Sequence, residues 1–476
     1  MRHMEKVDEA YILNRIEEEA DIYYRKYRPY MQLMERVSHW KRFKSPSAWD
    51  YRALGKMLEA VDDMIKMHEA NGSVADLGVL PRIARDVVTI MYGVSPLPLI
   101  ASVQPIDEEL GLIYYKRVKA VTGGGNISAG NVIVSVYGDY VTPQGYTNAE
   151  ITETIGTGDG TKTTFSATLS YKPVRPGTVV VQTGTVSGQD YNYDGNIFGA
   201  GVQGTVNYQT GAIDITFTTP PAAGATVNVT YWGNIEDLTL GVKEINYELD
   251  TKQVRARIYA VKGLVGLFKS WQLQKRFGVS AEEELAADLI NAINSEILGD
   301  LIRKMVNALP ATVTWNVTPP TGTDYFLHYQ TFKFFLAGAE KKLVQQAKRG
   351  IISFIIAGTQ ACAVIKSQLN WRQLFDGKGM FTAHLYGELE GIPVIRVVDS
   401  NVLAQDMMII GYKGASEFEA PAAFCPYMPI TVTTVLPTTH PLVTQRAAAC
   451  WAATEVLVNR FLVGGQVTGT FPWGES

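Results

Sequence analysis

Residues 149–234 interrupt the chain with a pattern that is almost free of helical periodicity, and this constrains the fold more than any other feature. The segment is rich in Thr, Gly and Val and poor in Lys and Arg. Its strand-like runs follow one another at roughly ten-residue spacing, as in small antiparallel sandwiches. One run, GTVNYQTGAIDITF, predicts a hairpin around Gln209-Thr210-Gly211. Because the flanking regions belong together, we expect residues 149–234 to be an inserted all-β domain.

The first 70 residues predict helices, because apolar side chains recur there at three- and four-residue spacing. The first stripe consists of Tyr11, Ile12, Ile16, Ala20, Tyr23 and Tyr24, and the second of Leu54, Met57, Leu58, Val61, Met64 and Ile65. Such helices pack either on the core of their own chain or, as an extended arm, on neighbouring subunits. The pattern leaves both alternatives open.

Two basic clusters in this region are interleaved with aromatic residues. The cations are Arg25, Lys26, Arg28, Lys41, Arg42 and Lys44, and the aromatic residues are Tyr24, Tyr27, Trp40 and Phe43. This mixture can contact phosphates, or it can bury the aromatic rings against another subunit while the charges stay hydrated. Since Glu and Asp surround both clusters, we favour burial against another subunit.

The clearest predicted helix begins near Ser280 and ends before Pro310. Ser280 and Glu283 have the spacing of a capping box, in which each side chain bonds a backbone amide at the helix start. The apolar residues stand four apart, at Leu285, Leu289, Ile293, Ile297, Leu301 and Met305. At the usual rise per residue such a helix is roughly 30–40 Å long, so it must lie along a sheet or another helix.

The C-terminal third predicts alternating helices and strands. Phe332, Phe335, Leu336, Ala339 and Leu343 mark one face of a helix that stops at Gly350. The apolar run 351–358 predicts a buried strand, and 391–399 and 406–414 predict two more. We expect a last helix at about 443–460, followed by a short strand.

Extended segments flank the insertion on both sides. Strand-like runs at 110–121 and 131–141 precede it, and a long run at 246–271 follows it and leads into helix. An isolated two-stranded ribbon is only marginally stable in water. We therefore expect this ribbon to lie on a neighbouring subunit.

The residue pattern offers no catalytic, cofactor-binding or metal-binding site. Three cysteines far apart and six histidines match no metal spacing, and no nucleophile motif is present. Asp190, Asn192, Asp194 and Gly195 resemble the start of a calcium loop, but Gly201 stands where the bidentate Glu is needed. The net charge of −4 gives no sign of a nucleic-acid binder. With no signal peptide and no run of ~18 apolar residues, we expect a protein made in a cytoplasm with no membrane partner.

Several segments together resemble the major capsid protein of T-even-type and jumbo tailed phages. The similar stretches are IASVQPIDEELGLIYYKR (100–117), EINYELDTKQVRARIYAVKGLVGLFKS with the long helix after it, AKRGIISFIIAG, GELEGIPVIRV and GYKGASEFEAPAAFCPYMPI (411–430). They occur in the family's order over about 76–145 and 235–462. The insertion resembles small immunoglobulin-like domains that are common on phage structural proteins.

The resemblance implies an α+β shell fold with a peripheral domain, a long spine helix, an axial domain, an extended two-stranded loop and an N-terminal arm. We expect a helical arm at 1–75, the start of the peripheral domain and the outgoing loop at 76–148, the insertion at 149–234, the returning loop and spine helix at 235–330, and the axial domain with the C-terminal return to the peripheral domain at 331–476.

The implied function is self-assembly into an icosahedral or prolate phage head around double-stranded DNA, without enzymatic activity. The implied partners are other copies of the chain, scaffold, portal, vertex or decoration proteins, and packaged DNA bound non-specifically. The expected location is the virion capsid, after synthesis in the cytoplasm of a bacterial host. The competing interpretation is a secreted or surface-attached binding module that uses the β-sandwich.

Overall fold

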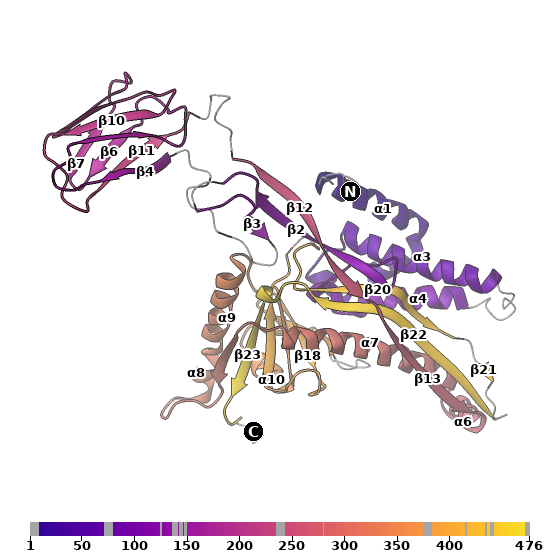
Figure 1. Ribbon diagram of the computed structural model, residues 1–476. Helices are drawn as coiled ribbons and strands as arrows, with labels where there is room; N and C mark the ends of the chain where they lie inside the picture. Colours follow the sequence, from indigo (N-terminus) through magenta and orange to yellow (C-terminus); the bar gives the residue numbers. More distant parts are fainter. Residues whose placement is uncertain are drawn as a thin grey trace. The chain divides into compact units, whose positions relative to one another are not determined.

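The computed structural model describes residues 9–70, 80–123, 126–135, 141, 146, 150–234, 243–278, 280–374, 383–414, 417–433, 436–437 and 442–471. The chain forms two compact units (Figure 1). The first unit consists of Met1–Lys116, Val136–Gly138 and Leu249–Ser476, and the second of Arg117–Ser135 and Asp139–Glu248. Helices and strands are both abundant, so the predicted α+β class is confirmed.

The N-terminal helices of the first unit are α1 (Glu9–Lys26), α2 (Arg28–Val37), α3 (Ala48–Ala70), α4 (Leu80–Val94) and α5 (Leu97–Ile100), with a 3₁₀ turn at His39–Arg42. Met31, Trp40 and Leu54 are fully buried in one apolar cluster with Leu301 and Phe354, which lie far along the chain. Of the two alternatives for this region, packing on the chain's own core is therefore the observed one. The aromatic rings of the basic clusters pack in the same chain, so their expected burial against another subunit is wrong for Tyr27 and Trp40.

A five-stranded sheet forms the next layer of the first unit. Its strand order is β1-β20-β22-β13, and β21 also pairs with β22. The strands are β1 (Ala101–Val103), β13 (Arg257–Gly266), β20 (Ala422–Val432), β21 (Leu436–Pro437) and β22 (Val443–Val456). The helix predicted at about 443–460 is wrong, because β22 occupies most of that range and pairs with β13 and β20. The alanines that favour a helix by propensity are small enough to pack between these strands and α7.

The predicted spine helix is α7 (Ala281–Asn307), and it follows the short helix α6 (Leu267–Phe277). Leu289, Ile293 and Ile297 are buried against Tyr259 of β13 and Cys450 of β22, as the apolar stripe predicts. Ser280 occupies the N-cap position but its side chain makes no capping hydrogen bond, so the predicted capping box is wrong in its contacts.

The remaining part of the first unit is a seven-stranded sheet with the order β14-β23-β19-β15-β18-β17-β16. Its strands are β14 (Thr312–Asn316), β15 (Phe354–Ala357), β16 (Trp371–Gln373), β17 (Ala383–Leu389), β18 (Ile392–Val397), β19 (Met407–Gly411) and β23 (Leu462–Thr468). Helices α8 (Tyr325–Gln330), α9 (Phe332–Ala347) and α10 (Thr359–Lys366) belong to this part, and a 3₁₀ turn at Asn459–Phe461 precedes β23. Phe332, Phe335 and Leu343 of α9 are buried against the sheet, as predicted.

The second unit contains an eight-stranded antiparallel sheet in the order β4-β11-β6-β7-β8-β9-β10-β5. Its strands are β4 (Glu150–Thr157), β5 (Thr164–Thr168), β6 (Val180–Thr183), β7 (Val186–Gln189), β8 (Asn196–Gly199), β9 (Val202–Val206), β10 (Ala212–Phe217) and β11 (Thr226–Trp232). They enclose a core of their own that includes Phe165, Ile215 and Tyr231. The strands form one continuous hydrogen-bonded path, and the predicted hairpin is present with Gly211 at φ 69°.

The extended segments β2 (Leu110–Ala120), β3 (Val132–Ser135) and β12 (Ile245–Arg255) form a three-stranded sheet with β2 in the middle. The predicted outgoing and returning ribbon thus has a third strand. None of the described helices is long and apolar enough to cross a membrane.

Candidate assembly surface

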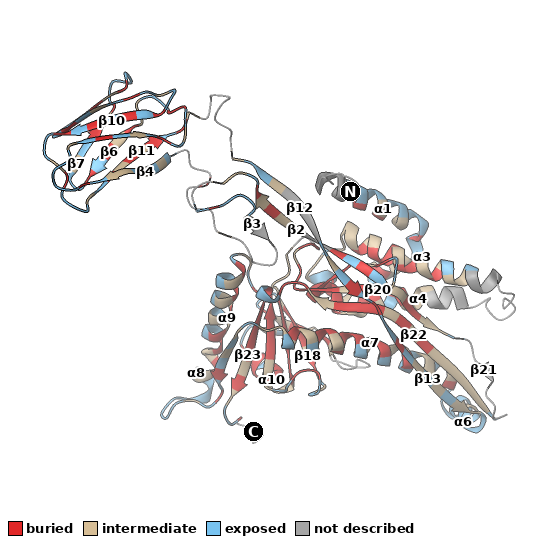
Figure 2. Ribbon diagram, in the orientation of Figure 1, coloured by how far each residue is buried: buried red, intermediate tan, exposed pale blue. Residues whose placement is uncertain are grey.

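Helix α6 is unusual in having no buried residue, although five of its eleven residues are large and apolar. Figure 2 draws it largely in the colour of exposed residues. Phe268 and Phe277 are each 71 % exposed, and Trp271 is 62 % exposed. Helix α6 contacts α7 and β13, yet it buries none of its apolar side chains against them. An exposed apolar surface of this kind marks a site of interaction with another molecule.

Strand β13 leads directly into α6 and also exposes apolar side chains. Tyr259 and Val261 face α7, so the alternate residues point to the other side of the sheet. Those alternate residues include Ile258, which is 66 % exposed, and Leu264, which is 59 % exposed. We call these side chains, together with the apolar side chains of α6, the α6–β13 surface.

The edge of the sheet is also open at this place. In the described part of the chain β13 is the last strand of the sheet order, so one edge of its ten-residue backbone has no strand beside it. An exposed edge strand with apolar side chains is a template for pairing with another chain. The open edge and the exposed apolar side chains therefore both favour contact with another protein chain.

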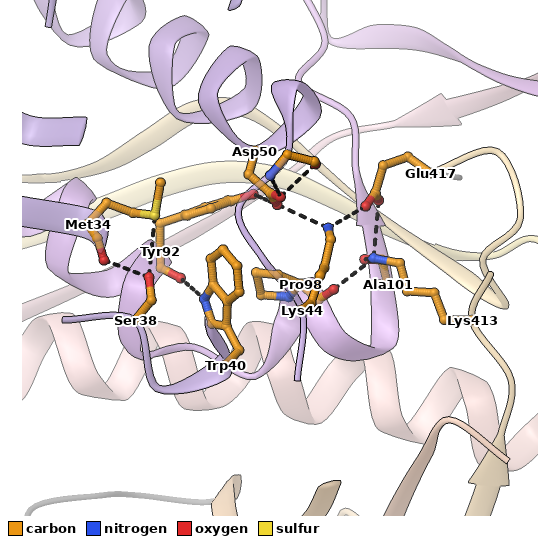
Figure 3. A network of polar contacts seen from close by, with 11 residues as sticks. Met34, Ser38, Trp40, Lys44, Asp50, Tyr92, Pro98, Ala101, Lys413 and Glu417 are labelled. Atoms are coloured by element: carbon orange, nitrogen blue, oxygen red, sulfur yellow. Dashed lines mark hydrogen bonds and ion pairs between the residues drawn. The ribbon is translucent and has the colours of Figure 1, made fainter. Parts of the chain in front are cut away.

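A buried ionic network fixes the N-terminal helices to the rest of the first unit (Figure 3). The ammonium group of Lys44 lies 3.2 Å from Asp50 Oδ1 and 2.6 Å from Glu417 Oε1. Lys413 Nζ lies 3.1 Å from Glu417 Oε2 and donates to the carbonyl oxygens of Pro98 and Ala101, each at 2.7 Å. The network thus joins the start of α3, the chain around α5 and the loop after β19.

Neutral groups complete the network. Tyr92 donates its hydroxyl proton to Asp50 Oδ1 at 2.9 Å, and the Trp40 indole N–H donates to the backbone carbonyl of Tyr92 at 3.2 Å. Ser47 donates to Asp50 Oδ2 through its backbone amide at 2.8 Å and its hydroxyl at 2.7 Å. Each of these bonds satisfies a polar group that burial removes from water.

Burial and charge act in opposite directions on the pKa values of this network. Burial alone would raise the pKa of Asp50, but Lys44 and the bonds from Ser47 outweigh it, so the pKa is lowered. Burial would lower the pKa of Lys44, but Glu417 and Asp50 raise it above its ordinary value. The pKa of Lys413 is lowered, because its complete burial outweighs the attraction of Glu417. Lys413 is therefore the member whose charge depends most on its partners.

The structure separates the residues of the calcium-like pattern. Asp190 is fully buried and accepts hydrogen bonds from the Gly177 amide and the Tyr208 hydroxyl, whereas Asp194 is exposed and bonds Asn196. The described residues contain no group of three or more side chains suited to hold a metal ion. Cys362, Cys425 and Cys450 are buried, and burial raises their thiol pKa values to about 12. Such thiols are unreactive near neutral pH.

Three of the six cations of the basic clusters form ion pairs within the chain. Lys26 pairs with Glu59 at 2.9 Å, Arg42 pairs with Glu388 at 2.8 Å, and Lys44 belongs to the buried network. Sequence reasoning identified the aromatic part of these clusters but missed the network. Its local signals are the spacing of Lys413 and Glu417, four residues apart, and that of Ser47 and Asp50, three residues apart.

Comparison with known protein families finds a match for this chain. Residues 98–460 match the family described as Major capsid protein Gp23, and this range is more than half of the chain. No curated protein matches the chain.

Several solved structures are similar to the chain at low identity. A protein of Gordonia phage Cozz is 13 % identical over 49 % of this chain and 76 % of its own, with a TM-score of 0.34. One of Mycobacterium phage Che8 is 11 % identical over 63 % of this chain and 91 % of its own, with a TM-score of 0.32. The capsid of Myoviridae phage XM1 gives 7 % identity over 66 % and 89 %, with a TM-score of 0.31. From the match over residues 98–460, the chain belongs to the Gp23 family of major capsid proteins, the structural proteins that form the shell of a bacteriophage head.

Proposed function

We propose that copies of this chain assemble into the head shell through the α6–β13 surface. The observation that carries the proposal is that α6 has five large apolar residues and buries none of them. Burying the rings of Phe268, Trp271 and Phe277 would remove roughly 300–400 Å² of apolar area from water. At ~25 cal/mol per Å² this corresponds to roughly 8–10 kcal/mol before the costs of association. These rings would form the apolar centre of a larger contact between identical subunits.

Strand pairing at the open edge of β13 would set the orientation of the contact. Backbone pairing with a strand of another subunit would satisfy the free edge and fix the register of the apolar side chains. We propose that the ribbon of β2 and β12 in another subunit supplies the partner strand. Extended segments of this kind gain stability by lying on another surface.

The remaining parts of the proposal follow from the family and the composition. Scaffold, portal, vertex or decoration proteins are the additional partners that we propose. Packaged DNA contacts the shell only non-specifically, since the net charge is −4. The chain acts in the virion after synthesis in the bacterial cytoplasm, and it carries out no chemistry. A secreted binding module is not favoured, because the family match covers the residues on both sides of the insertion.

We also propose that residues 149–234 form an immunoglobulin-like domain on the outside of the shell. This part of the chain has a separate apolar core, which includes Val181, Ile197 and Val229. A segment with its own core can be displayed without disturbing the shell fold.

The test of the assembly proposal is a pair of variants of the full chain. Phe268→Ser with Trp271→Ser removes two rings of the α6–β13 surface, and Ile22→Ser removes an apolar residue of α1 that is equally exposed at 62 %. We expect the double variant to give folded subunits without shells, and the control to give normal shells, both judged by electron microscopy and sedimentation. Normal shells from the double variant would overturn the proposal.

A further inference from the structure

The charges of α6 differ from those of the helix that follows it. Helix α6 carries Lys269, Lys275 and Arg276 and no acidic residue. The first turn of α7 carries Glu282, Glu283 and Glu284. Three positive charges and three negative charges therefore stand next to each other in sequence, on either side of residues 277–281.

In the described part of the chain these charges have no partner of opposite sign. Lys269, Lys275 and Arg276 are exposed, as are Glu283 and Glu284, and Glu282 is half-buried. Among the residues that the structure describes, no ion pair involves any of these six side chains, in contrast to Lys26 of α1 and Arg42 of the 3₁₀ turn. The two segments are thus complementary to each other but do not use that complementarity within one subunit.

Apolar side chains accompany the positive charges. Lys269 and Arg276 are seven residues apart, so they share one face of α6, while Leu267 and Trp271 share another. An aromatic and basic helix fits a partner surface that is apolar at the centre and acidic at the rim. The first turns of α7 supply the acidic part on every copy of this chain.

We propose that the occupant of α6 is a second copy of this chain, and that its basic residues pair with Glu282–Glu284 of that copy. The inference rests on the proposed assembly function and names the contact that this surface makes. Every copy carries both segments. Each subunit therefore contributes α6 to one contact and Glu282–Glu284 to the next contact around a local rotation axis. Charge complementarity fixes the register of the contact, and burial of the aromatic rings holds it.

The same charges also favour their own helix ends, because acidic residues stabilise the start of a helix and basic residues its end. Reversing either set would weaken its own helix whether or not an intersubunit contact exists. The two explanations differ for the combined reversal. If only the helix ends mattered, the combined variant would suffer both losses. If the contact exists, the combined variant regains it with opposite polarity.

The experiment uses three variants of the full chain. The first carries Lys269→Glu, Lys275→Glu and Arg276→Glu, the second carries Glu282→Lys, Glu283→Lys and Glu284→Lys, and the third carries all six. We expect each triple reversal to raise the protein concentration needed for assembly by about ten-fold or more, and the combination to return it to within about three-fold of wild type. A combined variant that folds but assembles no better than the triple variants would overturn the inference.

If the charge-reversal variants do not fold, variants that neutralise single charges provide the test. Lys275→Gln and Glu283→Gln remove one charge from each side with little change in shape. We expect the double neutral variant to assemble no worse than the poorer single variant, and additive losses would overturn the inference. Assembly of the variant with Phe268→Ser and Trp271→Ser distinguishes this inference from the proposed assembly function. If that variant loses shells while the charge variants show no compensation, the surface assembles by another register or with another partner.

Discussion

Replacing Glu417 by Gln removes the central carboxylate of the buried network while keeping its shape. Glu417 is 2.6 Å from Lys44 and 3.1 Å from Lys413. With an effective dielectric constant of about 20, each contact is an attraction of roughly 5–6 kcal/mol. Part of this is offset by the cost of burying the carboxylate, which is several kcal/mol per ion. The net loss expected on breaking such a buried pair is about 3–5 kcal/mol.

In the Glu417→Gln variant, Lys413 can fold without its proton. This limits the loss of stability and makes that loss depend on pH. Without Glu417, Lys413 keeps two carbonyl partners and only the weaker attraction of Asp50, and its pKa is already lowered by burial. If it folds uncharged at pH 7, the cost is at most about 4–5 kcal/mol, from ~1.4 kcal/mol per pH unit below its unfolded pKa of about 10.4. A lysine with a depressed folded pKa destabilises the fold below its unfolded pKa. The destabilisation therefore shrinks as the pH rises from 7 to 9.

The assay is urea unfolding of purified subunits, followed by tryptophan fluorescence at pH 7, 8 and 9. Glu455→Gln is the matched control, because its pair with Lys252 is more than one third exposed and is worth at most about 1 kcal/mol. Lys413→Met combined with Glu417→Gln should weaken the pH dependence, since the lysine that remains next to position 417 is Lys44, which keeps Asp50 as its partner. A loss below about 1 kcal/mol for Glu417→Gln, or a loss independent of pH, would show that water reaches these groups and that the reasoning is wrong.

Three further predictions follow from the same structure. Ile297 is 1 % exposed, so Ile297→Asp buries a carboxylate at a cost of several kcal/mol and should give insoluble protein, whereas Ala292→Asp on the exposed side of α7 should give normal yields of soluble subunit. Acidification should destabilise the N-terminal helices. Pairing with Lys44 outweighs burial and lowers the pKa of Asp50, so its contribution is present above about pH 4 and is lost below it, which a pH series of melting curves will record. Replacing residues 149–234 by a short Gly/Ser linker should leave the first unit folded, and the isolated segment should show a β-type circular dichroism spectrum. A disordered segment together with an unfolded deletion variant would show that these boundaries are wrong.

The elements that sequence reasoning predicted well are those whose pattern is periodic and local. The four-residue spacing from Leu289 to Met305 made α7 predictable in type and extent, and the apolar run at 351–358 made β15 predictable. The alternation around Gln209-Thr210-Gly211 identified the hairpin of β9 and β10, because glycine accepts the left-handed conformation that the turn needs.

The elements that were missed depend on contacts between distant segments. Residues Ala447–Ala449 favour a helix by intrinsic propensity, but they lie between two strands that come from elsewhere in the chain. The ionic network was not predictable, because Lys44 and Glu417 are 373 residues apart and no local motif joins them. The α6–β13 surface was not predicted. Five of the eleven residues of α6 are large and apolar, but their exposure appears only in the fold.

The measurement that tests the central claim most directly is electron microscopy of the purified wild-type chain over a range of protein concentrations, with sedimentation of the same samples. The account predicts that shells, tubes, hexamers or pentamers form above a threshold concentration and that Phe268 and Trp271 become protected from solvent when they do. A chain that remains monomeric at every concentration, with α6 exposed throughout, would contradict it.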